Sequence, residues 1–516
     1  MNSFSKNSEG VDVMRKIFIS SILLIALLLF AGCGNDNNND KPSDNNNSNN
    51  NAANDEDSAT ISLMLNLHTP EVPNDRLIKV LEEEANVKLD IDWVPDNNYE
   101  ERLNTAFSTN SLPQVILVKT DQFIQFKEAI RDDQFWEIGP YLDEFENLSK
   151  LREDTLDNQK VDDKLYSVYM GRPLSRHGII YRKDWADALG LEAPTNTEEF
   201  FEMVKAFTEN DPDDNGKDDT IGLTDREGLG TFQTIADWFG VPNNWGEKDG
   251  ELLPNFMFPE YKEALEFFKE IHGNGYMNQD APVTSKTDQQ DMIKDGTAGV
   301  YIGSMQDVRP IYEDAKNINP NVEFDVHNYV EGPDGEYRTR SIPGYGSLVM
   351  FPKSAIENED ELKVILGFYD YLMSPEGANI LIWGLEGEHY EVIDGKAQFI
   401  EGEEELIDRE VRPLSALEVG EPTTNGRYEG YYDYEPLTKA YELYTDNENY
   451  LTTDPTIGLD SETFMKQSET LNQIIEDASI NFILGDIDEE GFDAAIESWK
   501  NQGGNQVIEE YNESRK

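Results

Sequence analysis

The stretch that decides the fold class runs from Thr60 to Pro95 and reads TISLMLNLHTPEVPNDRLIKVLEEEANVKLDIDWVP. Apolar and polar side chains alternate from Ile61 to Leu67 and again from Val87 to Trp93, which predicts a strand at each end. Between these strands, Asn74 is placed to cap a helix. One face of that helix carries Leu77, Ile78, Leu81 and Ala85.

The segments that follow extend the same alternation. A helix is expected around Tyr99–Phe107, and the wholly apolar run Val115–Val118 is typical of a buried parallel strand. Thr195-x-x-Glu198 has the pattern of a capping box opening a helix. Further strands are expected at 298–303 and 347–351 and further helices at 261–271 and 361–373, so the sequence predicts an α/β fold with parallel strands.

The composition excludes several classes of function. The chain has 516 residues, with 42 Lys+Arg against 104 Asp+Glu and a formal net charge of −62. Nucleic-acid binding and docking on anionic lipid both need clustered basic residues, so both are disfavoured. The single cysteine allows no intramolecular disulfide and no cysteine-based zinc site.

The N-terminal 59 residues predict export and anchoring rather than a folded body. Arg15 and Lys16 precede the apolar run Ile17–Phe30, which is short for a bilayer span and fits a signal peptide over 1–32, with Met14 as a possible start. The run ends in Phe30-Ala31-Gly32-Cys33, which resembles a bacterial lipobox, so Cys33 is the expected lipidation site. The alternative is a short buried helix with an ordinary core cysteine.

Residues 33–59 are rich in Asn, Asp and Ser and hold almost no apolar side chains. Such a segment buries too little surface to offset its chain entropy, so a disordered tether is expected after Cys33. Asn-rich aggregation-prone sequence is the alternative. The expected location is therefore the extracellular face of the membrane, with the folded body held by a lipid anchor.

Several motifs together resemble the family 1 extracellular solute-binding proteins, the receptors of ABC importers for sugars and oligosaccharides. The matching stretches are Tyr181–Trp185, Leu189–Leu191, Pro194-Thr195, Asp211–Asp219, Tyr371–Gly377, Trp383–Tyr390 and Phe482–Tyr511. The resemblance covers essentially all of residues 60–516, and the large lipoproteins of Gram-positive bacteria are the most similar subgroup.

The resemblance implies two α/β lobes that are discontinuous in sequence, with the ligand in the cleft between them. It places residues 60–172 and 343–383 in the N-terminal lobe, and 173–342 and 384–516 in the C-terminal lobe. The chain is expected to cross between lobes near Val168–Ile180, Ile342–Ser347 and Trp383–Tyr390. The resemblance also implies an oligosaccharide ligand and a monomeric receptor. The permease and the ATPase of the importer are expected to be other chains.

An acidic loop has the spacing of an EF-hand calcium site. Asp211, Asp213, Asn215 and Asp219 occupy positions 1, 3, 5 and 9, Gly216 supplies the turn, and the carbonyl of Lys217 falls at position 7. The usual bidentate carboxylate is absent because position 12 is Gly222. Relatives in the family place a carboxylate at position 10, where this chain has Thr220. We expect a structural Ca²⁺ here, with an acidic surface turn as the alternative.

Sugar sites combine aromatic faces with polar side chains. The candidates in expected crossing or rim segments are Trp383, Glu386, His389, Tyr390, Tyr345, Trp238, Trp245, Arg172, Arg176, Gln306 and Asp307. Each has a structural alternative: a tryptophan is commonly core, His389 commonly a structural hydrogen-bonder, and the arginines either pair with carboxylates or recognise an acidic sugar. A tyrosine-rich loop at 428–434 adds further aromatic rings.

Enzyme motifs are missing from the sequence. There is no HExxH, no GxSxG and no Walker A loop, and paired carboxylates carry little information among 104 acids. The prediction is a binding protein without enzymatic activity. The alternatives are an anchored glycoside hydrolase or lyase, and a peptide-binding receptor.

Overall fold

The computed structural model describes residues 58–69, 71–120 and 122–515. The expected signal peptide, Cys33 and nearly all of the expected tether therefore lie outside the described residues. Among the described helices, none is both long and apolar enough to cross a membrane. The described body, Ser58–Lys516, forms one unit that contains two lobes, each built around its own sheet.

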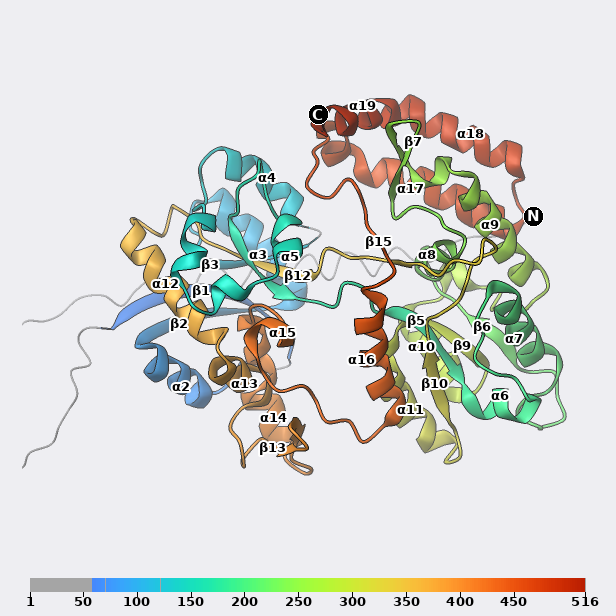
Figure 1. The fold of residues 1–516 in the computed structure, drawn as a ribbon, viewed down its shortest axis with the longest axis horizontal. Helices are drawn as coiled ribbons and strands as arrows, with labels where there is room; N and C mark the ends of the chain where they lie inside the picture. The colour runs from blue at the N-terminus through green and yellow to red at the C-terminus, as the bar shows by residue number, and fades with distance from the viewer. Residues whose placement is uncertain (1–57, 70, 121, 516) are drawn as a thin grey trace, which may run out of the picture. The chain divides into compact units, whose positions relative to one another are not determined.

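The N-terminal lobe is built on a five-stranded sheet in the order β2-β1-β3-β12-β4 (Figure 1). Its strands are β1 (Ala59–Leu67), β2 (Val87–Pro95), β3 (Val115–Lys119), β4 (Ser167–Gly171) and β12 (Tyr345–Met350). Strand β1 pairs in parallel with β2 and β3, whereas β12 runs antiparallel to β3 and β4. The predicted strand–helix–strand start and the parallel pairing are confirmed.

Helices cover this sheet because each presents an apolar stripe to it. They are α2 (Asp75–Ala85), α3 (Asp96–Ser108), α4 (Phe123–Arg131), α5 (Glu153–Asp157), α12 (Glu359–Leu372), α13 (Pro375–Trp383) and α14 (Glu404–Glu410). Asn74 caps α2 as expected, accepting a hydrogen bond from Arg76 N. Ser374 caps α13, with Pro375 in its first turn and Gly384 at its end. The sheet and helices share a single buried core.

The C-terminal lobe is built on a four-stranded sheet in the order β10-β5-β9-β6. Its strands are β5 (His177–Arg182), β6 (Ile221–Thr224), β9 (Ala298–Ser304) and β10 (Phe324–His327). Strand β5 is antiparallel to β9 and β10, and β6 is parallel to β9. Successive side chains of β5 point to opposite faces, so Ile179 and Ile180 belong to different core clusters.

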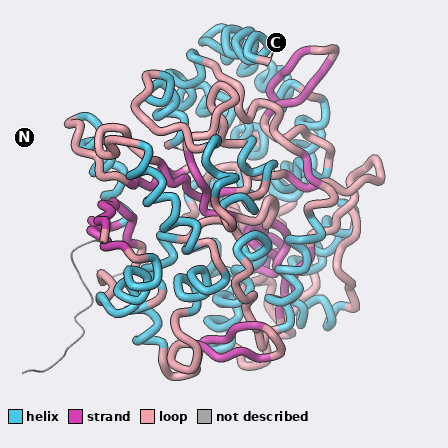
Figure 2. Tube along the Cα trace, turned by 60° about the vertical axis from the view of Figure 1, so that its left-hand side comes forward, coloured by secondary structure: helices cyan, strands magenta, loops and turns pink. Residues whose placement is uncertain are grey.

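One face of this sheet packs against α6 (Lys183–Leu189), α7 (Thr197–Glu209) and α8 (Gly230–Trp238). The core on that face is extended by α9 (Pro259–Gly273), on which α17 (Glu462–Leu484) packs, and by α18 (Glu489–Trp499) and α19 (Asn505–Ser514), which pack on α17. The other face packs against α10 (Lys286–Asp295), α11 (Val308–Ile318) and α16 (Glu435–Asn447). Figure 2 shows helices enclosing the strands of the sheets. Full burial of each large apolar side chain contributes about 1.5–3 kcal/mol.

Short strand pairs complete the fold. They are β7 (Trp245–Lys248) with β8 (Glu251–Pro254), β11 (Thr339–Arg340) with β15 (Leu451–Thr452), and β13 (Tyr390–Ile393) with β14 (Lys396–Phe399). The helix expected from a Thr195–Glu198 capping box begins one residue later. Asn196 is its cap and accepts from Glu199 N, while the Glu199 carboxylate accepts from Thr195 N. The offset arises because the Asn196 side chain reaches the free N–H groups.

The expected boundary at 384 differs from the observed packing. Ile407, Leu414 and Val419 are buried in the core of the N-terminal lobe, although 384–516 was assigned to the C-terminal lobe. Gly420 N donates to Tyr169 O at 2.8 Å, which adds this segment to the edge of β4. Farther along, Ala397 N donates to Glu429 O and Tyr431 N donates to Ala397 O, so the chain stays beside β14 as far as Tyr431. The last crossing therefore follows Tyr431 and leads into α16, and the segment expected to cross, Trp383–Tyr390, is followed by residues of the N-terminal core.

Candidate functional site

In both lobes, the carboxyl ends of sheet strands lie next to the segments that cross between the lobes. Strand β4 ends at Gly171 and β5 begins at His177, so residues 172–176 form the first crossing between the lobes. Strand β9 ends beside the start of β5, with Ser304 opposite His177. Ligands of open α/β sheets bind beyond the carboxyl ends of strands. The first crossing therefore marks the candidate site.

Unpaired arginines gather at this place. Most described arginines form ion pairs with carboxylates, for example Arg182 with Asp184 at 2.7 Å. Among the described residues, no ion pair to a carboxylate is formed by Arg172, Arg176, Arg226, Arg340 or Arg409. All of these except Arg409 lie in a crossing segment or directly after a strand end. The chain has a formal net charge of −62, so these arginines form a local concentration of positive charge in an acidic protein.

The arginines of the C-terminal lobe act together on His177. Burial, followed in decreasing order by the positive charges of Arg176, Arg340, Lys286 and Arg226, lowers the pKa of His177 to about 4. Arg340 Nη2 donates to the side-chain oxygens of Asn243 and Asn244, which are neutral acceptors and leave the charge of the guanidinium group uncompensated. His177 is thus neutral at pH 7 in a positive local field.

A second group surrounds Arg172. Its side chain is exposed to solvent, yet the surrounding protein lowers its pKa. Glu418 opposes that shift, and the charges of Arg176 and Arg427 add to it. Glu418 is buried and pairs with Arg427 at 3.0 Å. The charges acting on Arg172 are therefore one carboxylate and two other guanidinium groups, which leaves the group positively charged and able to accept an anion.

Aromatic rings adjoin the same region. Tyr432 stacks on Tyr441 with ring centroids 5.0 Å apart, and Tyr441 is 39% exposed. Tyr441 also contacts Tyr444 edge-to-face, and the Tyr444 hydroxyl accepts from Gln306 N at 2.8 Å. Burial raises the pKa of Tyr432, and the nearby Arg427 charge opposes the rise. Tyr441 therefore adds a partly exposed aromatic side chain to this region.

The sequence candidates fall into two groups in the structure. Arg172, Arg176, Tyr345, Gln306 and Asp307 lie at the strand ends and crossings. Tyr345 is largely buried, with its hydroxyl donating to Asn158 O at 3.3 Å, and Asp307 accepts from Tyr301 at 3.1 Å. Tyr345 and Asp307 are held by these hydrogen bonds at the strand ends. Arg172, Arg176 and Gln306 remain accessible to solvent.

The remaining candidates are placed elsewhere. Trp238 packs on Phe200 and Trp245 on Tyr511 inside the C-terminal core. Trp383 and Tyr390 form a small buried cluster. His389 has no exposed surface and bridges Glu410 at 3.2 Å, while Glu386 is exposed near β13. Burial of these aromatic and histidine side chains leaves them little contact with solvent in this structure, and a role for them in ligand binding stays a prediction.

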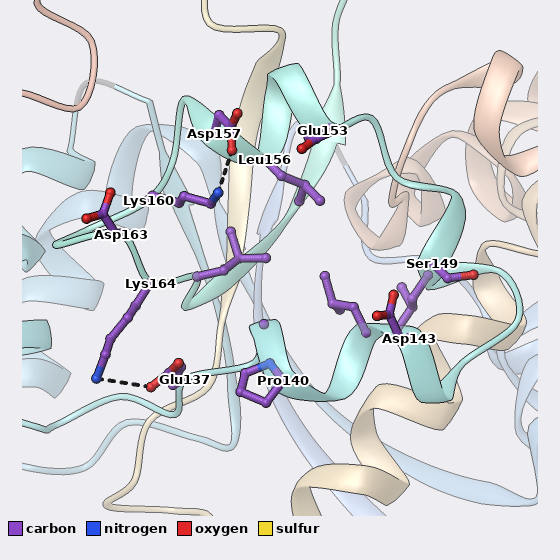
Figure 3. A pocket seen from close by; sticks show the side chains of 14 residues that line it. Glu137, Pro140, Asp143, Ser149, Glu153, Leu156, Asp157, Lys160, Asp163 and Lys164 are labelled. Atoms are coloured by element: carbon purple, nitrogen blue, oxygen red, sulfur yellow. Dashed lines mark hydrogen bonds and ion pairs between the residues drawn. The ribbon is translucent and has the colours of Figure 1, made fainter.

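A cavity of about 380 Å³ lies in the N-terminal lobe beside α5 (Figure 3). Its rim carries Glu137, Asp143, Glu153, Asp157 and Asp163. Both of its lysines already pair with rim carboxylates, Lys160 with Asp157 at 2.5 Å and Lys164 with Glu137 at 3.3 Å. The surplus of carboxylates repels an anion, so this cavity does not fit an acidic ligand.

In the acidic loop at 211–219, the side-chain amide of Asn215 is the group to which the carboxylates of Asp213 and Asp219 are hydrogen-bonded. Asn215 Nδ2 donates to Asp213 at 2.7 Å and to Asp219 at 3.0 Å, while Asp211 accepts from Gly216 N. Thr220 instead donates to Phe207 O and faces away from the loop. Within the described part of the chain, no set of three or more His, Cys, Asp or Glu side chains is arranged to hold a metal ion. The donor set is therefore right in type but incomplete.

The fold and this basic edge define a two-lobed binding protein. A family model for bacterial extracellular solute-binding proteins matches residues 73–379. The chain belongs to this family. It is 39% identical over 466 residues to the polygalacturonan/rhamnogalacturonan-binding protein YtcQ of Bacillus subtilis (strain 168), covering 89% of this chain and 92% of that one. It is 33% identical to lipoprotein LipO of the same strain, covering 88% and 91% of the two chains.

Solved structures support the fold independently. A solute-binding protein of Bifidobacterium longum infantis, described as associated with an HMO-binding ABC transporter, has a TM-score of 0.72 at 15% identity, covering 89% of this chain and 98% of that one. FusA of Streptococcus pneumoniae in complex with kestose has a TM-score of 0.61 at 17% identity, covering 88% and 98%. The predicted two-lobed α/β fold is thereby confirmed.

Proposed function

We propose that this protein captures an acidic oligosaccharide, of the galacturonate class, and delivers it to an ABC permease. The observation that carries the proposal is the group of unpaired arginines at the strand ends, in a chain that is otherwise strongly acidic. The name of the YtcQ relative, which refers to two uronate-containing polysaccharides, supports the same ligand class.

The chemistry of the arginines suits this ligand. A guanidinium group presents paired N–H donors that match the two oxygens of a carboxylate, and such charge-assisted bonds are among the stronger ones in proteins. Arg172 and Arg176 would bind carboxylates, and the exposed ring of Tyr441 would support the apolar face of a sugar ring. The acidic remainder of the surface would repel the same ligand, so binding is confined to this edge.

Ligand binding would also set the lobe geometry. Arg172 follows β4 of the N-terminal lobe, whereas Arg226 follows β6 of the C-terminal lobe. A ligand that contacts both favours the conformation in which the lobes are close, and hinge closure then follows from differential affinity. The permease would recognise that closed form.

A binding protein and a hydrolase or lyase are separated by product formation. Incubation with a galacturonate oligosaccharide is expected to quench or shift tryptophan fluorescence without releasing new reducing ends or unsaturated products. Product release at catalytic rates would refute the receptor and favour the enzyme alternative. Tight binding of peptides, with no response to glycans, would favour a peptide receptor.

The location proposed for the receptor is the outer face of the cell membrane. Cys33 would carry the lipid, and the Asn-rich segment 34–58 would tether the folded body. The relative named lipoprotein LipO supports this anchoring. The receptor would act as a monomer, with the permease and ATPase supplied by other chains.

We also propose that the loop at 211–219 holds a structural Ca²⁺. Asp211, Asp213, Asn215 and Asp219 supply hard oxygen donors at alternate positions, together with the Lys217 carbonyl. Water or a rearranged carboxylate would complete the shell. The ion would stiffen the turn between α7 and β6 and take no part in ligand capture.

Calcium is expected to raise the thermal midpoint of unfolding. At a concentration about 100 times the dissociation constant, a bound ion adds about 2.7 kcal/mol to the unfolding free energy. EDTA should remove this gain, and Asp213→Asn should reduce it, because a donor charge is lost while an amide oxygen remains. Asp249→Asn, in the exposed β7–β8 turn, is the control and should keep the gain. An identical midpoint in calcium and EDTA would leave the loop as an acidic turn.

A further inference from the structure

A glycine in β12 forms a bulge beside the first crossing. Strand β12 pairs Tyr345 with Gly171 and Ser347 with Met170, so Gly346 is an extra residue between two paired positions. Thr120 pins the bulge by donating to the carbonyl oxygens of Tyr345 and Gly346, at 3.1 and 3.2 Å. A bulge that contains glycine commonly marks a place where another group approaches the backbone closely.

The group that approaches is the side chain of Arg172. Its backbone N–H donates to Gly344 O at 2.9 Å, which fixes the residue next to the return segment. A Cβ added at Gly346 would lie 2.8 Å from Arg172 Nε and 3.3 Å from its Cγ. The φ angle of Gly346 is not positive, so the backbone itself does not require glycine. Space for the arginine is therefore the evident reason for glycine here.

Among the described residues, no nitrogen or oxygen acceptor and no carboxylate holds the guanidinium group in this position. The one contact that the structure gives it is Nη2 at 3.9 Å from Met170 Sδ, a weak acceptor. Glu418, the acid that most affects its charge, is paired with Arg427. The close packing of the Arg172 side chain on the backbone of Gly346 thus sets the direction in which its N–H donors point.

We propose that Gly346 is a specificity-determining residue that positions Arg172 to bind a ligand carboxylate. This inference rests on the proposed function and adds the residue that sets its preference for acidic sugars. The clash caused by a methyl group would fall on a flexible side chain, which can move at little cost to folding. Selectivity for the acid, and not stability, is then the property that changes.

The test is a binding comparison between galacturonate trisaccharide and its methyl ester. Gly346→Ala is expected to weaken binding of the acid about tenfold or more and to leave the ester unchanged, because one charged hydrogen bond is lost. Gly273→Ala is the matched control, since an added Cβ there has no atom within 4 Å. The thermal midpoint of each variant, from scanning fluorimetry, reports on folding.

A double-mutant cycle separates positioning from general damage. Arg172→Gln removes the guanidinium group, so Gly346→Ala should cost nothing further in the Arg172→Gln background. If the affinity losses of the two substitutions add, or if Gly346→Ala binds the acid as the wild type does, the role of Gly346 is overturned and the proposed acidic ligand is not. Equal affinity of the wild-type protein for acid and ester would overturn this role together with the proposed acidic ligand.

Discussion

Replacing Arg172 and Arg176 together with glutamine is expected to weaken binding of galacturonate trisaccharide by about 100-fold or more. A hydrogen bond to a charged group is worth about 1.5–3 kcal/mol, so two of them account for about 3–6 kcal/mol. Each 1.4 kcal/mol is about tenfold in affinity. Neither arginine pairs with a carboxylate in the described structure, so their replacement leaves no buried acid without a partner.

The control variants are arginines that already have surface partners. Arg102 pairs with Asp92 at 3.0 Å and Arg338 with Asp334 at 2.7 Å. Their replacement by glutamine alters the net charge by the same amount, but no ligand-facing donor is lost. Calorimetry should give wild-type affinity for this control pair. Equal losses in both pairs would mean that net charge, and not a defined site, governs binding.

Replacement of Cys33 by serine is expected to abolish attachment of lipid. The thiol is the only one in the chain, so no other cysteine can substitute for it. Two acyl chains suffice for stable anchoring, and their loss removes that anchor entirely. Metabolic labelling with a tagged fatty acid in a Gram-positive host should mark the wild-type protein and leave the Cys33→Ser variant unlabelled.

The matched control for the anchor is Ser48→Ala in the tether, which should label like the wild type. Labelling of the Cys33→Ser variant would show that lipid is attached elsewhere or not through a thiol. An unlabelled wild-type protein would refute the lipobox interpretation. The alternative, an ordinary core cysteine in a short buried helix, would then be favoured.

The parts of the fold that sequence predicts are those with local periodicity. Alternation in β1 and β2 and the apolar run of β3 indicate strands, because burial on one or both faces imposes these patterns. The last crossing was misplaced for a related reason. The apolar side chains of residues 407–419 show that the segment is buried, but not which of two cores receives it.

The site was only partly predictable. Arg172 and Arg176 were candidates because they lie in a crossing, and the structure leaves both without carboxylate partners. The contributions of Arg226, Arg340 and Arg427 depend on which acids lie nearby, and that is set by residues distant in sequence. Trp238, Trp245 and Trp383 are buried in the structure, and sequence alone does not distinguish a core ring from a sugar platform.

Gly346 shows what sequence signal was available but unused. A glycine inside a strand pattern indicates a bulge or a close approach. Only the structure shows that the approaching group is the Arg172 side chain. The charge on that side chain is what connects a detail of strand pairing to the choice of ligand.

The most direct test of the acidic-ligand account is calorimetry of the wild-type protein with galacturonate trisaccharide and with its fully methyl-esterified form, at low and at high salt. The two ligands differ only in the carboxylates that the arginines are proposed to bind. The account predicts about 100-fold tighter binding of the acid at low salt, with the advantage shrinking as salt screens the charges. Equal or tighter binding of the ester, independent of salt, would contradict it.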